Sequence, residues 1–195
     1  MKSCIPLFLL LLIGCNESDK ETSPDAEGPI TNIPKTPELI QELQAQPTID
    51  DQLSILYQKF EPMLDRSDSL TGPDDNSDGI RDDIEAFINA LEVTEPERNA
   101  LKQDARQTQE NLYYDFSVKT DENEVKAIEI ARKYERVVAC KDFVGMSIDD
   151  LINTSRTVVA LTYNTKARTM AYLAYNRILD GTVSTSLKAE ARYCE

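Results

Sequence analysis

The sequence predicts an all-α protein, a compact bundle of five to seven helices with a disordered tether before it. Apolar residues recur at helical spacing in most segments of the chain. Ser, Thr or Asp precedes most of these segments, as expected for helix starts. Alternating strand patterns are almost absent, and residues 182–187 are the one short candidate. The 195 residues suffice for one buried core, without an internal repeat or a second domain.

The first two predicted helices begin at threonines. Thr36 and Pro37 open a short helix that extends to Gln46. Thr48 starts the next helix, in which the apolar stripe continues to Leu64.

The middle of the chain predicts two more helices. One covers residues 82–91 and has acidic residues in its first turn, where they complement the helix dipole. The other begins at a capping box made by Thr94 and Glu97 and continues toward Phe116.

The C-terminal third predicts three helices. The first covers about residues 120–145, and the second runs from Ser147, the capping residue, to Leu161. The last covers about residues 164–179 and stops at Gly181.

Composition excludes several functions. There are 35 acidic and 21 basic residues, a net charge of -14 and no histidine. The negative charge argues against binding nucleic acid. Without histidine there is no Ser-His-Asp or Cys-His nucleophile system and no zinc site with His ligands. We therefore favour a protein that is not an enzyme.

The first fifteen residues have the pattern of an export signal. Lys2 precedes the apolar stretch 5–13, which is too short to span a bilayer. The sequence Leu12-Ile13-Gly14-Cys15 resembles the lipobox of bacterial lipoproteins. That resemblance implies that residues 1–14 are a signal peptide and that acylated Cys15 binds the lipid bilayer.

The resemblance also implies a location in the bacterial cell envelope. Asn16 replaces the aspartate of the inner-membrane retention signal, so a host with two membranes would carry the protein on the periplasmic face of the outer one. Residues 15–37 are rich in proline and acids, which predicts a flexible tether. The helical domain is expected to occupy residues 38–195.

Two cysteines remain when Cys4 leaves with the signal peptide and Cys15 carries lipid. They are Cys140 and Cys194, and an even pair in an exported protein predicts a disulfide. A catalytic Cys140 is disfavoured because no imidazole can generate its thiolate.

Residues 74–85 match the calcium-loop pattern D-x-[DN]-x-[DN]-G-x5-E at every position. Calcium takes six to eight oxygen ligands, which a short chain supplies by curling around the ion. The predicted ligands are the side chains of Asp74, Asn76, Asp78, Asp82 and Glu85 and the carbonyl of Ile80. A solvated acidic turn that caps the following helix is the alternative.

The loop resembles those of EF-hands, with Arg81 where they carry an apolar residue. Ile80, one position earlier, makes it more similar to the loops of thrombospondin type 3 repeats and related bacterial modules. There is a single copy, and nine residues separate it from Leu64, so a paired sensor is not supported. The resemblance implies a structural calcium ion that orders the loop and the next helix.

A longer resemblance implies no activity. Residues 76–88, with Asn153, Thr154 and Arg156 further on, are similar to a group of uncharacterised bacterial exported proteins. That resemblance covers about residues 70–195.

Two other sets of residues have competing interpretations. A pocket for an anionic or sugar-like group is one interpretation of six tyrosines and arginines, although helix packing is the commoner role of such tyrosines. These are Tyr163, Tyr172, Tyr175, Arg156, Arg168 and Arg177. Asp149 and Asp150 could act as paired carboxylates, but neighbours on a helix do not face each other, and Asp150 is better explained as a cap.

Together these features predict a membrane-anchored envelope lipoprotein, with a calcium-stabilised helical domain that binds or scaffolds an envelope protein or polymer. One alternative is a calcium- or carboxylate-assisted hydrolase of an envelope polymer. The other is an inhibitor or immunity-type lipoprotein that uses the acidic N-terminal half, residues 1–125, as its interface.

Overall fold

The computed structural model describes residues 28–195, and its long elements are all α-helices. They are α1 (Pro37–Gln44), α2 (Ile49–Phe60), α3 (Asp82–Ala90), α4 (Glu95–Glu110), α5 (Asp121–Phe143), α6 (Ile148–Thr162) and α7 (Lys166–Ile178). Single 3₁₀ turns occupy Glu61–Met63, Asn111–Tyr113 and Ala191–Tyr193. No strand forms between residues 28 and 195, so the predicted all-α class is confirmed and the strand candidate at 182–187 is wrong. The predicted signal peptide and Cys15 lie outside the described residues.

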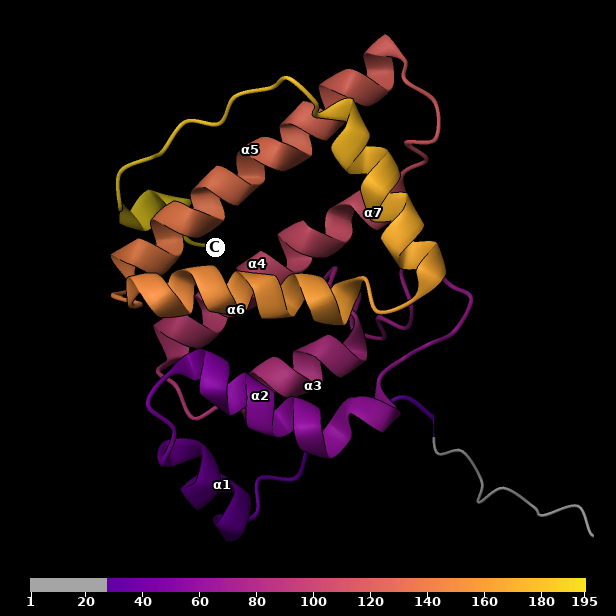
Figure 1. The fold of residues 1–195 in the computed structure, drawn as a ribbon. Helices are drawn as coiled ribbons and strands as arrows, with labels where there is room; N and C mark the ends of the chain where they lie inside the picture. Colours follow the sequence, from indigo (N-terminus) through magenta and orange to yellow (C-terminus); the bar gives the residue numbers. More distant parts are fainter. Residues whose placement is uncertain (1–27) are drawn as a thin grey trace, which may run out of the picture.

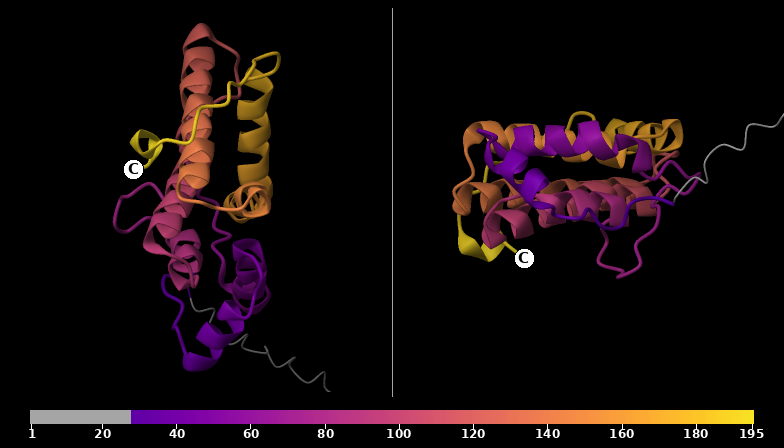
Figure 2. Two further views of the ribbon diagram at one scale, coloured as in Figure 1. Left: turned by 90° about the vertical axis from the view of Figure 1, so that its left-hand side faces the viewer. Right: turned by 90° about the horizontal axis from the view of Figure 1, so that it is seen from below.

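The helices form two layers (Figures 1 and 2). One layer contains α3, α4 and α5, and the other contains α2, α6 and α7. Helix α4 is central, because it packs against α3, α5 and α6. None of the helices within residues 28–195 has both the length and the apolar composition that a bilayer crossing requires.

The predicted capping residues are confirmed. At each, a side-chain oxygen accepts a hydrogen bond from the backbone N–H three residues later, which satisfies one of the free N–H groups of the first helical turn. The residues are Thr36, Thr48, Thr94, Thr120 and Ser147. Thr94 and Glu97 form the complete capping box.

The second helix ends earlier than its apolar stripe predicts. Helix α2 stops at Phe60, because Pro62 has no N–H to continue the helical bonds and the chain turns into a 3₁₀ helix. Leu64 nevertheless remains buried in the core.

The folded domain begins before the predicted boundary at residue 38. Ile30 and Ile33 are buried in the main core, and the Ile30 N–H donates to the Met63 carbonyl at 2.9 Å. The tether predicted for residues 15–37 therefore extends too far, because these two apolar side chains fill a gap beside α2.

The core has two parts. The larger lies among α2, α3, α4 and α6, and the smaller joins α5 to α7 around Phe116, Ile130 and Ile178. After α7, an extended segment returns along α5, and Cys194 reaches Cys140 in the predicted disulfide (Figure 1).

Candidate functional site

The acidic loop before α3 folds around its own amides. The two carboxylate oxygens of Asp74 accept from the N–H groups of Asp78 (3.1 Å) and Gly79 (2.9 Å). Asn76 Oδ1 also accepts from the Asp78 N–H at 3.0 Å, and Asp78 Oδ1 accepts from the Ile80 N–H at 3.0 Å. Gly79 has a φ of 84°, the left-handed conformation that glycine adopts without strain. The predicted ligands at positions 74, 76 and 78 thus face the inside of one turn.

Asp82 closes the loop and has an unsatisfied oxygen. The residue is 8% exposed, and its Oδ1 accepts from the Asp75 N–H at 3.1 Å. Its buried Oδ2 has no hydrogen-bond partner within residues 28–195. Burial, and then the negative charges of Asp75, Asp74 and Glu85, raise the pKa of Asp82. A cation in the loop would supply the missing partner and offset this repulsion.

Glu85, the last predicted ligand, is occupied by other groups. Its carboxylate accepts from Lys102 Nζ at 2.8 Å and from Asn76 Nδ2 at 3.1 Å. As the side chains lie in residues 28–195, no three acidic or cysteine groups converge closely enough to hold a metal. The donor chemistry suits calcium, and Glu85 would have to leave Lys102 to complete the site.

Arg81 anchors the loop in the protein interior. It is fully buried, and its guanidinium bonds both oxygens of Asp83, at 2.5 and 3.0 Å. It also donates to the carbonyls of Leu161 (2.9 Å) and Thr162 (3.2 Å) at the end of α6. The departure from the EF-hand pattern at this position thus has a structural role, which a single loop pattern does not reveal.

A second buried arginine holds the connection that leads to the loop. Arg168 on α7 pairs with Asp65 and donates to the carbonyls of Ser69 (2.8 Å) and Leu70 (3.0 Å). Burial alone would raise the pKa of Asp65, but the hydrogen bond from Arg168 and those from Ser67 hold it below its usual value. Arg168 is therefore not part of a tyrosine pocket.

Asp150 joins two helix starts. Its Oδ1 accepts from the Ile49 N–H at 2.7 Å, and its own N–H donates to Ser147 Oγ at 3.0 Å. This carboxylate caps α2 as well as belonging to the first turn of α6, which confirms the capping interpretation.

A buried polar cluster lies between α4, α5 and α6. Lys141 is fully buried, and its ammonium pairs with Asp104 and donates to Thr154 Oγ1 (3.0 Å) and Ser155 Oγ (2.8 Å). Ser155 Oγ in turn donates to Asp104 at 2.7 Å. The sequence does not reveal this cluster, because its members are spread over about fifty residues.

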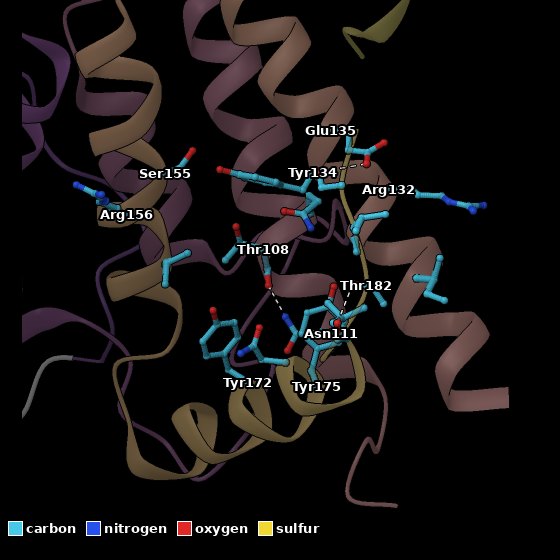
Figure 3. Close-up of a pocket in the computed structure, with 18 of the residues that line it drawn as sticks. Thr108, Asn111, Arg132, Tyr134, Glu135, Ser155, Arg156, Tyr172, Tyr175 and Thr182 are labelled. Atoms are coloured by element: carbon cyan, nitrogen blue, oxygen red, sulfur yellow. Dashed lines mark hydrogen bonds between the residues drawn. The ribbon is translucent and has the colours of Figure 1, made fainter. Parts of the chain in front are cut away.

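An open cavity adjoins this cluster. It has a volume of about 1100 Å³ and is lined by residues of α4, α5, α6, α7 and the extended segment 182–185. Figure 3 shows Tyr134 reaching from α5 toward Ser155, with Tyr172 and Tyr175 at the opposite end. Glu135 accepts from the Thr185 N–H at 2.8 Å, which holds the extended segment at the rim.

Four of the six tyrosines and arginines for which the sequence allows a pocket line this cavity. Tyr163 and Tyr172 stack with their ring centres 4.5 Å apart, and Tyr175 and Arg156 also line the cavity. Arg177 instead lines a separate groove beside Phe116. The three tyrosines and one of the arginines therefore line one cavity.

Asn111 is a buried, hydrogen-bonded polar residue of the cavity wall. It is 2% exposed, and its Nδ2 donates to the Thr108 carbonyl at 2.8 Å and to the Tyr163 hydroxyl. The Tyr163 hydroxyl donates to the same carbonyl at 2.6 Å, and burial raises the pKa of Tyr163. Asn111 Oδ1 is buried without a partner in the described part of the chain.

Comparison with known proteins assigns no family. No protein-family model, curated protein or solved structure matches the chain.

Proposed function

We propose that this protein is a lipid-anchored binding module of the bacterial envelope, whose helical domain is ordered by calcium and holds a ligand in the cavity between α4 and α7. The cavity is the observation that carries the binding role. Its volume of about 1100 Å³ lies just above the range of about 300–1,000 Å³ for small-molecule sites, and it is lined by tyrosine rings and by polar groups.

The polar cluster beside the cavity supports binding more than hydrolysis. Ser155 is a possible nucleophile, and Lys141 Nζ lies 2.8 Å from its hydroxyl. An ammonium that pairs with Asp104 and donates to two hydroxyls has no lone pair to accept the serine proton. The chain has no histidine to replace it.

Calcium fits the loop through its oxygen donors and through the unsatisfied Asp82 Oδ2. The side chains of Asp74, Asn76, Asp78, Asp82 and Glu85, with the carbonyl of Ile80, would hold the ion. Calcium supplies positive charge among these carboxylates. Because Arg81 ties the loop to α6, a helix of the cavity wall, ordering of the loop supports the cavity indirectly.

The anchor is proposed from the lipobox alone. Acylated Cys15 would hold the domain at the membrane surface, where an envelope polymer or protein is within reach. Residues 16–27 would connect it to the first buried residue of the domain, Ile30.

Site-directed photocrosslinking in cells tests the binding role. A benzophenone amino acid at Ile152, which lines the cavity, is expected to give a crosslinked adduct in membranes. The matched control is Ile148, one helical turn earlier on α6, which is 77% exposed and outside the cavity. Equal labelling at the two positions, or none at Ile152, would contradict the proposed function.

A further inference from the structure

The cavity between α4 and α7 has the chemistry of a carbohydrate site. From its lining we infer that it takes a neutral oligosaccharide, an inference that rests on the proposed binding function. Three features carry it: the absence of charged groups directed at its centre, the tyrosine rings in its lining, and an unsatisfied acceptor in its wall.

The charged residues of the lining do not face a ligand. Figure 3 shows the guanidinium groups of Arg132 and Arg156 on opposite sides, each turned away from the centre of the cavity. Glu135, the acid in the lining, is engaged by Ser184 (3.2 Å) and Thr185 (2.8 Å) of the extended segment. As these side chains lie, the centre of the cavity presents no opposite charge to an anionic ligand, whereas a neutral ligand needs none.

Aromatic rings supply flat apolar surfaces. Tyr172 stacks on Tyr163, and Tyr134 lies across the other end of the cavity. The C–H faces of a sugar ring pack on such rings, while its hydroxyl groups find hydrogen-bond partners on tyrosine and amide side chains. Ile152 and Val159 add apolar contact on the α6 side.

Asn111 requires a donor that the protein does not provide. Its Oδ1 is buried and without a partner in residues 28–195, and a buried unsatisfied acceptor costs free energy. Figure 3 places Asn111 between Thr108 and the two tyrosines of α7, Tyr172 and Tyr175. The oxygen has less than 1 Å² of accessible surface, so a ligand hydroxyl can donate to it only when the Asn111 side chain turns toward the cavity, whereas the carboxylate or alkyl chain of a fatty acid has no proton to donate.

Binding is measured with the full chain in detergent and calcium. The sequence has eight tyrosines and no tryptophan, so tyrosine fluorescence reports on the cavity without a tryptophan background. The probes are maltotriose and chitotriose as neutral oligosaccharides, palmitate as an anionic amphiphile, and inorganic phosphate. We expect saturable quenching with at least one trisaccharide and none with palmitate or phosphate.

Tyr172→Ala is expected to weaken trisaccharide binding about tenfold, because it removes one aromatic face. The matched control Tyr57→Ala removes an exposed tyrosine of α2 outside the cavity and should leave binding unchanged. Tyr172→Phe keeps the ring and should bind like the native chain, and a melting temperature of Tyr172→Ala close to the native one would show that its loss of binding is not a folding defect.

Binding of palmitate alone would overturn the carbohydrate inference while leaving the binding role intact. Failure of both trisaccharides to bind, or binding that Tyr172→Ala does not change, would also overturn it. The crosslinking at Ile152 is independent of ligand class, so failure of the proposed function would be seen separately.

Discussion

Arg81 and Asp83 form a two-point ion pair in which both side chains are almost completely buried, at 1% and 0% exposure. The pair lies where the acidic loop enters α3. Through the carbonyls of Leu161 and Thr162, the same guanidinium connects the loop to the end of α6. The Arg81 side chain therefore couples the loop to the end of α6.

Removing one partner of this pair should be severely destabilising. Arg81→Met leaves the Asp83 carboxylate buried without its counter-charge, so we expect the free energy of unfolding to fall by about 3–5 kcal/mol. Urea denaturation measures this free energy of unfolding. The double variant Arg81→Met/Asp83→Asn removes the stranded charge and should lose less than Arg81→Met alone.

The exposed pair Lys126–Glu129 is the control for this prediction. Lys126→Met should leave the urea midpoint almost unchanged, because surface ion pairs are screened by solvent. If Arg81→Met costs no more than Lys126→Met, the anchoring role of Arg81 is wrong.

The Cys140–Cys194 bond closes a long loop across α5, α6 and α7. The two residues are 54 positions apart, which in the chain-entropy model corresponds to about 4 kcal/mol of stabilisation. Cys194→Ser should lower stability by about that amount and free the extended segment beside the cavity. Mass spectrometry after alkylation should find no free thiol at either position in the native protein, and two alkylated cysteines would refute the bond.

Without calcium, Asp82 should make the free energy of unfolding fall as pH rises. The folded state raises the pKa of Asp82, so deprotonation disfavours folding. The stability that the protonated carboxyl group contributes is therefore lost as pH rises from about the ordinary value of 3.8 through the folded value. In EDTA at neutral pH, Asp82→Asn should therefore melt at a higher temperature than the native chain.

The exposed Asp68→Asn serves as the matched control, since it removes one carboxylate outside the loop. It should leave the melting temperature in EDTA at neutral pH near that of the native chain. An Asp82→Asn variant that melts lower than the native chain in EDTA would show that its carboxylate is already compensated without an ion.

The lipid anchor has a direct test in cells. Radiolabelled acyl chains should be incorporated into the native protein, and Cys15→Ala should abolish labelling and release the domain from membranes. Cys140→Ala keeps the lipobox intact and should remain labelled. Labelling that persists in Cys15→Ala would remove the lipoprotein assignment.

The helix starts could be predicted because their determinants are local. Thr94 and Glu97, three residues apart, satisfy each other's backbone groups whatever the rest of the chain does. The Cys140–Cys194 bond could be predicted by elimination, since the lipobox resemblance implies other roles for Cys4 and Cys15. The end of α2 was missed because the apolar stripe continues past Pro62 and Leu64 is buried without being helical.

The interior polar contacts could not be predicted, because their partners are distant in sequence. Asp65 pairs with Arg168 across about a hundred residues of sequence, and Arg81 bonds the Leu161 carbonyl across 80 residues. The cavity likewise depends on how four helices cross. The sequence pointed to Tyr163, Tyr172, Tyr175 and Arg156 of its lining, for which helix packing was the commoner role.

Calcium titration of the purified protein tests the central claim, that an ion in loop 74–85 orders the domain. Isothermal titration should show one saturable calcium site per chain, absent in Asp82→Asn and retained in Asp68→Asn. At about a hundredfold excess over the dissociation constant, calcium should add about 2.7 kcal/mol to the free energy of unfolding. No saturable binding at millimolar calcium, or binding that survives Asp82→Asn unchanged, would contradict the account.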